Sequence, residues 1–379
     1  MIPVNEPLLE KEDFDLLEDA FKTGWISSAG KYVEQFEHDW ASYCGCKYGI
    51  SVSNGTTALQ VAVESIGIEP GDEIIMPTYT IISCAMAIIR SGAKPVLIDS
   101  KKDTWCIDVD KIESKITPRT KAIMVVHIFG HPVDMDPVIE IAKKYNLKII
   151  EDAAEVHGAE YLHKRGTDSK KWIRCGSLGD VSTFSFFANK LVTTGEGGMV
   201  VTNDKEISDR AKSLRNLCFR EDRRFKHTEL GHQFRFTNMQ AAVGIKQIKR
   251  MDKIIEKKRW AANEYHKRLQ DLESISLPIE KSWAKNVYWV HSILLNDECG
   301  MDAYQLASKL HEKGVETRPF FLGMHDQPVF KKMNLFKNEK YPVADFIAKN
   351  GLYLPSGLAL TIDQIDFSAD AVKEALSER

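Results

Sequence analysis

Short apolar runs alternate with longer helical stretches from about residue 46 to residue 205 of the chain. Each run holds only a few residues, many of them Val or Ile, which favours buried strands over helices. The runs are 48–53, 73–77, 95–99, 122–127, 147–152, 181–186 and 199–202. Continuous apolar strands separated by helices are typical of a sheet that is covered on both faces. The pattern predicts an α/β fold with a mostly parallel, seven-stranded sheet and helices on both faces.

The C-terminal part of the chain has a different pattern. Residues 240–272 have helical periodicity and many charges, which predicts a long connecting helix. Predicted strands follow at 289–295 and 314–321, and predicted helices at 303–312 and 369–376. Because 379 residues are too many for one compact core, we expect two domains. The large one spans 1–250 with the N-terminal segment, and a smaller α/β domain spans 251–379 with the connecting helix.

Composition and charge exclude several classes of partner. The formal net charge is -3, with 28% charged and 43% hydrophobic residues, which gives no reason to expect nucleic acid or an anionic membrane. The polar and basic stretch 160–176 is typical of a surface hairpin whose charges are solvated.

The N-terminal residues lack the basic start and apolar core of a signal peptide, and no segment is long and apolar enough to span a bilayer. The seven cysteines are scattered, and no set of His, Cys and Asp has the spacing of metal ligands. We therefore expect a cytoplasmic protein with reduced thiols and no metal.

The first candidate for chemistry is Lys190, which ends the apolar and aromatic segment 182–190 and precedes the glycine-rich segment 193–199. A lysine enclosed by such neighbours has a lowered pKa, so its amine can attack a carbonyl. The glycines allow the backbone to approach a bulky, planar group. The alternative is a strand that ends at the surface with Lys190 in water.

A second candidate lies at 53–59, Ser-Asn-Gly-Thr-Thr-Ala-Leu, where a predicted strand is followed by a helix. The free N–H groups and the dipole at a helix start favour a phosphate. The alternative is ordinary N-capping by Asn54 or Thr56.

The third candidate is Asp152, which ends an apolar strand, so that its carboxylate is expected to face a cation. Glu155 lies one helical turn further on and could reach the same ligand. The alternative is that Asp152 caps a following helix. Together with Ser185, five residues before Lys190, these segments supply a phosphate cradle, an acid for a ring nitrogen and an enclosed amine. Pyridoxal 5′-phosphate (PLP) needs these three groups.

These motifs resemble those of the DegT/DnrJ/EryC1/StrS sugar aminotransferases, which are PLP enzymes of the aspartate aminotransferase fold (fold type I). The resemblance runs nearly end to end, through 24–28, 53–59, 71–73, 151–158, 184–199 and 235–242. Residues 179–187 and Arg318-Pro-Phe-Phe with His325 are similar to the GDP-perosamine synthase-like members.

The resemblance implies that Lys190 binds the cofactor covalently and later moves protons. It places Asp152 at the pyridine nitrogen and Glu155 at the 3-hydroxyl of the ring. The phosphate would be held by Gly55, Thr56 and Ser185.

The resemblance also implies a homodimer with shared active sites, in which Gln233 reaches the phosphate of the partner. Arg318, His325 and Ile81 would contact substrate. Two positions depart from the family pattern: Gln233 stands where Asn is usual, and Ile81 stands where an aromatic residue usually stacks on the cofactor.

The reaction implied is transfer of an amino group from L-glutamate to a keto-sugar, a nucleotide-linked 4-keto-6-deoxy sugar as for GDP-perosamine. Its product would serve a surface polysaccharide such as a capsule or O-antigen. An alternative acceptor is a small phosphorylated ketone such as dihydroxyacetone phosphate, which gives serinol phosphate. A PLP-dependent sugar dehydratase is a further alternative, but such relatives carry His in place of the lysine.

A non-catalytic protein would not need Lys190, Asp152 and Ser185 together. A nicotinamide enzyme is excluded because the glycines at 195–198 lack the strand–Gly-x-Gly-x-x-Gly–helix context. For His127 and His131 we expect core or turn roles. His157 could support Asp152.

Overall fold

A seven-stranded sheet organises the computed structural model, which describes residues 1–164 and 166–378. Its strands are β1 (Tyr48–Val52), β2 (Glu73–Pro77), β3 (Lys94–Ile98), β4 (Thr120–Val126), β5 (Lys148–Asp152), β8 (Val181–Ser185) and β9 (Gly198–Thr202). Their order is β1-β9-β8-β5-β4-β2-β3; β9 runs antiparallel to β1 and β8, and the other neighbouring pairs of these described strands are parallel. Every strand predicted for this sheet is confirmed within two residues.

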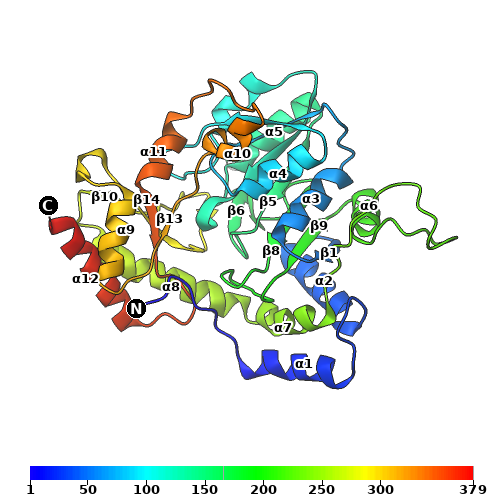
Figure 1. Cartoon of the computed structure of the whole chain (residues 1–379), viewed down its shortest axis with the longest axis horizontal. Helices are drawn as coiled ribbons and strands as arrows, with labels where there is room; N and C mark the ends of the chain where they lie inside the picture. Colours follow the sequence, from blue (N-terminus) through cyan, green and yellow to red (C-terminus); the bar gives the residue numbers. More distant parts are fainter. Residues whose placement is uncertain (165, 379) are drawn as a thin grey trace.

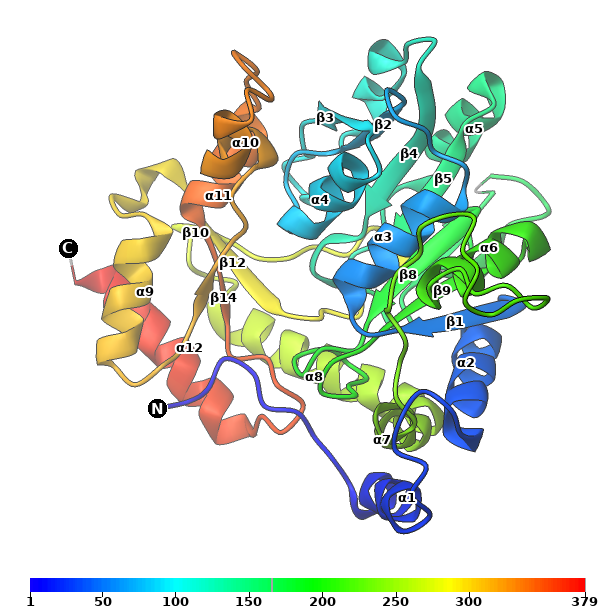
Figure 2. The same ribbon diagram turned by 45° about the vertical axis from the view of Figure 1, so that its right-hand side comes forward.

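Helices cover both faces of this sheet (Figures 1 and 2). The helices of this part of the chain are α1 (Lys11–Lys22), α2 (Lys31–Cys44), α3 (Gly55–Ser65), α4 (Ile82–Arg90), α5 (Met135–Tyr145), α6 (Lys205–Arg215) and α7 (Asn238–Lys249). α3 packs against α4 and α6, whereas α2 packs against α7. The sequence analysis did not predict α1 or α2.

The predicted connecting helix at 240–272 is two helices, since α7 ends at Lys249 and α8 spans Met251–Leu269. Arg250 between them leaves helical geometry, with φ -107° and ψ 18°. Its guanidinium bonds the Asp13 carboxylate of α1, with Nη1 2.8 Å from Oδ1. The prediction of one helix was wrong because this tertiary ion pair lies at the break between the two helices.

A second sheet has the order β10-β12-β14-β13. Its strands are β10 (Ile275–Ser276), β12 (His291–Leu295), β14 (Gly351–Leu354) and β13 (Arg318–Pro319), with helices α9 (Ala303–Glu312), α10 (Pro328–Lys332), α11 (Pro342–Asn350) and α12 (Ile362–Ser377). The strand predicted at 314–321 is reduced to Arg318–Pro319, because Val315 pairs with Ile2 outside the sheet and Phe321 lines a cavity.

The stretch 160–176 forms the predicted hairpin, with β6 (Glu160–His163) antiparallel to β7 (Lys171–Arg174). A short strand β11 (Ala284–Lys285) joins it on the other side of β6. None of the helices in the described part of the chain combines the length and the hydropathy that a membrane span requires.

We propose a domain boundary at residue 250. It is supported by the start of α8 at Met251 and by a separate cluster of buried apolar side chains around the second sheet, which includes Tyr265, Ile293 and Leu306. The N-terminal segment is shared, since Ile2 pairs with Val315 beside that sheet.

Candidate active site

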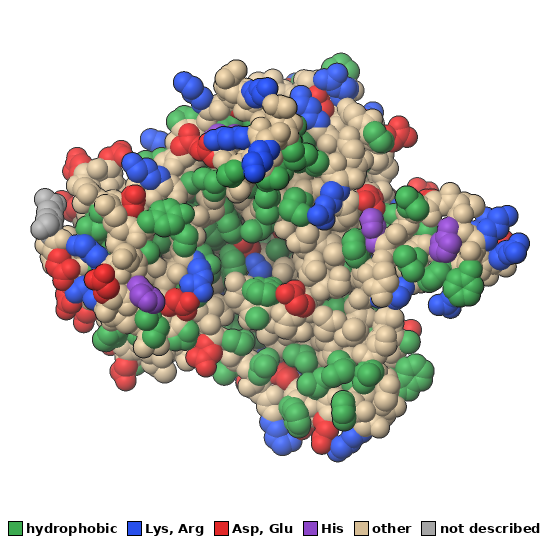
Figure 3. All heavy atoms as spheres, viewed as in Figure 1, with side chains coloured by type: hydrophobic (Ala, Val, Ile, Leu, Met, Phe, Trp, Pro, Cys, Tyr) green, Lys and Arg blue, Asp and Glu red, His purple; other side chains and the backbone are tan. Residues whose placement is uncertain are grey.

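A cavity of about 450 Å³ lies between the carboxyl edge of the large sheet and the second sheet. The face shown in Figure 3 is hollowed near its centre. In open α/β sheets this edge is where ligands bind. Seven of the predicted site residues line the cavity: Gly55, Thr56, Ile81, Asp152, Glu155, Ser185 and Lys190. The fold thus brings together segments that are far apart in the sequence.

One end of the cavity is the start of α3. Asn54 is the N-cap, and its side chain accepts a hydrogen bond from the Thr57 N–H at 2.9 Å, so the capping alternative is confirmed for Asn54. Gly55 lies so close to Ser185 that a Cβ on Gly55 would be 2.8 Å from the Cβ of Ser185. The backbone and hydroxyls of this helix start therefore form a narrow cradle that suits a phosphate.

Asp152 also lines the cavity, and it is 3% exposed at the end of β5. Its Oδ1 accepts from the Ala154 N–H at 3.1 Å and its Oδ2 from the Cys84 thiol at 3.1 Å. Burial raises the pKa of the Asp152 carboxyl. The helix-cap alternative was wrong, because residues 153–159 form turns and no helix follows β5 directly.

Lys190 lies inside the cavity, with a side chain that is only 9% exposed. Its Nζ is 3.8 Å from Glu155 Oε1 and 3.6 Å from the centre of the Trp289 ring. Burial lowers the pKa of the Lys190 amine, while the Glu155 and Asp152 carboxylates oppose that shift. The alternative of a lysine in water was wrong.

Glu155 is held in a fixed position beside this amine. Its Oε2 accepts from the Phe129 N–H at 2.8 Å, and burial raises the pKa of its carboxyl. Because no helix follows β5 directly, the turn of 153–159 brings it there instead of a helical repeat.

Aromatic side chains that the sequence analysis did not select close the cavity from the side of the second sheet: Trp289, Phe321 and Tyr353. The Trp289 indole N–H donates to the Asn189 carbonyl at 2.8 Å, next to Lys190 in the chain. In the sequence, Trp289 stands at the start of a predicted strand, and that position does not show which way its ring faces.

Three predicted site residues do not line this cavity. Gln233 is exposed, and the Arg318 side chain is 48% exposed and paired with Glu316 at 2.6 Å. His325 is buried between the Thr78 hydroxyl at 2.8 Å and the Asp345 carboxylate at 2.7 Å. Their contacts with phosphate or substrate therefore stay predictions.

The three other histidines considered in the sequence analysis, His127, His131 and His157, are buried. His127 Nδ1 accepts from the Val133 N–H at 2.9 Å, so its Nε2 donates to the buried Glu151 at 3.1 Å, which confirms a core role. Burial lowers the pKa of His157 to about 3, and its Nε2 has no hydrogen-bond partner among the described residues. The idea that His157 supports Asp152 is not confirmed.

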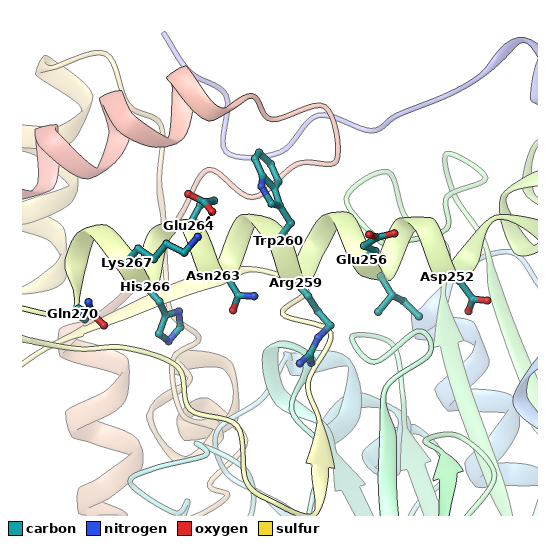
Figure 4. A pocket seen from close by; sticks show the side chains of 10 residues that line it. Asp252, Glu256, Arg259, Trp260, Asn263, Glu264, His266, Lys267 and Gln270 are labelled. Carbon is teal, nitrogen blue, oxygen red and sulfur yellow. Dashed lines mark hydrogen bonds and ion pairs between the residues drawn. The ribbon is translucent and has the colours of Figure 1, made fainter.

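A larger hollow of about 740 Å³ runs along α8 (Figure 4). Its residues come from that helix and its C-cap, and several of its charges are paired, as in Lys267 with Glu264 and Arg259 with Glu280. This lining is typical of a solvated helix surface.

The residues of the smaller cavity fit PLP. A helix start with Thr56 and Ser185 suits the phosphate, a buried carboxylate at Asp152 suits a protonated ring nitrogen, and the enclosed Lys190 amine suits the aldehyde. The narrow approach at Gly55 would be filled by any side chain there.

Comparisons with known proteins show which family the chain matches. Residues 7–373 match the DegT/DnrJ/EryC1/StrS aminotransferase family. The GDP-perosamine synthase of Escherichia coli O157:H7 is 38% identical, over 100% of this chain and 99% of its own length. That of Caulobacter vibrioides is also 38% identical, over 99% and 98%. The structure of Helicobacter pylori PseC, an aminotransferase involved in the biosynthesis of pseudoaminic acid, covers 100% of both chains with a TM-score of 0.92 and 25% identity.

Proposed function

Because the chain belongs to the DegT/DnrJ/EryC1/StrS aminotransferase family and is thus a PLP-dependent aminotransferase, we propose that it moves an amino group from L-glutamate to a GDP-linked 4-keto-6-deoxy sugar. The observation that carries the acceptor is the 38% identity to GDP-perosamine synthases over essentially the whole chain. The observation that carries the chemistry is the cavity in which Lys190, Asp152 and the start of α3 meet.

Each end of the cavity has one task in this proposal. Gly55, Thr56 and Ser185 bind the phosphate at the positive end of the α3 dipole. Asp152 keeps a proton on the ring nitrogen, because a buried carboxylate favours a neighbouring positive charge. When bound, PLP draws electrons from the substrate carbon that carries the amino group.

Lys190 moves the proton to and from that carbon. Its lowered pKa leaves more of the amine neutral and able to accept a proton at neutral pH. Once protonated, its Nζ lies on the Trp289 ring face and near the Glu155 carboxylate, two groups that stabilise an ammonium. The closed aromatic side of the cavity keeps water from the reacting atoms.

We also propose a homodimer with shared active sites. Among the described residues, the cavity lining carries the carboxylates of Asp152, Glu155 and Glu196 against the single ammonium of Lys190. An anionic cofactor and anionic substrates need further positive or donor groups, which a second copy could supply.

An apolar surface supports the same assembly. Large exposed side chains gather on and around α1, as the hydrophobic side chains in the lower part of Figure 3 show. They are Leu8, Leu9, Phe14, Phe21, Trp25 and Ile26. A patch of this kind on a soluble protein is typical of an interface.

The seven buried free cysteines fit a reducing compartment, so we place the protein in the cytoplasm. There it would make a precursor of a surface polysaccharide such as a capsule or O-antigen.

If Gln233 reaches the phosphate of the partner, Gln233→Ala should weaken retention of PLP by roughly 10-fold, since one hydrogen bond to a charged group is lost. The measurement is the PLP dissociation constant by dialysis and absorbance. Gln35→Ala, at another exposed glutamine, is the control. A fully active monomer in sedimentation would contradict the shared site.

The acceptor is tested with the pyridoxamine phosphate (PMP) form of the enzyme, made with excess L-glutamate that is then removed. We expect GDP-4-keto-6-deoxymannose to restore the PLP absorbance, and dihydroxyacetone phosphate to leave it unchanged. If dihydroxyacetone phosphate alone restores the PLP absorbance, the acceptor is a small phosphorylated ketone and the sugar acceptor is wrong. If glutamate never converts the PLP form, the donor assignment is wrong.

A further inference from the structure

The first turn of α4 contacts two of the residues that line the cavity, Thr56 and Asp152. Ser83 Oγ lies 2.8 Å from Thr56 Oγ1 at the phosphate end, and the next residue, Cys84, lies 3.1 Å from Asp152 Oδ2. Two adjacent residues thus connect one helix to both subsites. Ser83 lines the cavity, whereas Cys84 is completely buried behind Asp152.

The direction of the Cys84 hydrogen bond follows from its surroundings. Burial raises the pKa of the Cys84 thiol well above its ordinary value, so the group is an S–H donor and the Asp152 carboxylate is the acceptor. The Thr80 hydroxyl lies 3.4 Å from the Cys84 sulfur, and it donates to the sulfur because the thiol proton is already directed to Asp152. A short chain of donors, Thr80 to Cys84 to Asp152, therefore ends on the carboxylate.

We propose that Cys84 is a positioning residue that holds Asp152 ionised and oriented toward the ring nitrogen of the cofactor. This inference rests on the proposed function, in which Asp152 pairs with that nitrogen. The thiol and the Ala154 N–H each bind one oxygen of the carboxylate, so the plane of the group is set from both sides.

The charges around Asp152 explain why such a donor matters. Lys190 favours the ionised carboxylate, whereas Glu155 is a like charge, and burial disfavours ionisation; the nearby His127 ring is engaged by Val133 and Glu151 instead. Without the thiol donor, Asp152 would take up a proton at a higher pH. The protonated acid cannot pair with a protonated ring nitrogen, so ligand binding would weaken first on the acidic side.

The experiment measures the dissociation constant of PMP between about pH 5 and 9 for the wild type, Cys84→Ala and Cys84→Ser. PMP is chosen because it makes no covalent bond to Lys190. Taking the ratio of variant to wild type at each pH cancels the ionisation of PMP itself. Circular dichroism and thermal melting check that each variant is folded.

For Cys84→Ala we expect the ratio of PMP dissociation constants, variant over wild type, to be about 3 to 10 at the acidic end and to fall as the pH rises. A loss of this size is expected when a weak donor to a charged group is removed. Cys84→Ser keeps a donor and should bring the ratio back toward one. Cys106→Ala is the matched control, since this buried thiol donates to the His131 carbonyl instead of to Asp152, and its ratio should stay near one.

Two outcomes overturn the inference: a Cys84→Ala ratio that does not change with pH, or a Cys84→Ser variant that behaves like alanine. The first would mean that the thiol only fills space, and the second that sulfur volume matters and the donor does not. If wild-type protein fails to bind PMP at all, the proposed function fails, and the two failures are thereby distinguished.

Discussion

Lys190→Ala is expected to lower transamination by roughly 1,000-fold or more, since proton transfer by a positioned side chain contributes about 10²- to 10⁴-fold. The reason is structural: Lys190 is the one cation in the described cavity lining, and its Nζ lies between the Glu155 carboxylate and the Trp289 ring. The variant should still bind PLP without a covalent bond, because the cradle at Gly55 and Ser185 and the carboxylate of Asp152 are unchanged.

Steady-state turnover and borohydride trapping measure this together. In the wild type, reduction should add the cofactor mass to the peptide that contains Lys190, and in the alanine variant to none. Lys190→Arg keeps a cation but cannot react with the aldehyde, so it should be equally inactive. Lys212→Ala, an exposed lysine on α6, is the neutral control. Wild-type turnover in Lys190→Ala, or trapping at the buried Lys258, would refute the assignment.

The second large effect is expected for Asp152→Asn, which should lower turnover by roughly 10- to 1,000-fold. An opposite charge beside an ionisable group shifts the pKa of that group by about one to three units. The amide of the variant has the volume of the carboxylate but no charge, so it no longer holds a proton on the ring nitrogen. The loss should fall on turnover more than on glutamate affinity, because the ring nitrogen acts on the transition state. The PLP absorbance should also titrate differently with pH in this variant.

Asp204→Asn serves as a control for loss of a carboxylate, since Asp204 caps α6 and does not line the cavity. It should change stability slightly and leave turnover unchanged. Unchanged turnover in Asp152→Asn would show that Asp152 has only a structural role. Measuring both variants under the same conditions separates an electrostatic effect from a general loss of folded protein.

The local pattern of apolar and polar residues was enough to predict the strands of the large sheet and the segments that supply most of the candidate cavity. Buried parallel strands are continuous apolar runs, and polar residues that directly follow such runs meet at one edge of the sheet. For this reason Asp152, Ser185 and Lys190 could be selected from positions in the sequence alone. The surface and capping alternatives needed the structure, because burial and the turn at 153–159 depend on neighbours from other segments.

The sequence by itself determined the sheet, the cofactor class and the residues at the ends of β5 and β8, since these follow from periodicity and from side-chain chemistry. Only the tertiary structure decided that Trp289 lies against Lys190, that Cys84 donates to Asp152, and that the connector breaks at Arg250. Each of these contacts joins residues at least 68 positions apart, the separation of Cys84 and Asp152. No local pattern encodes such a contact, because it exists only after the chain has packed.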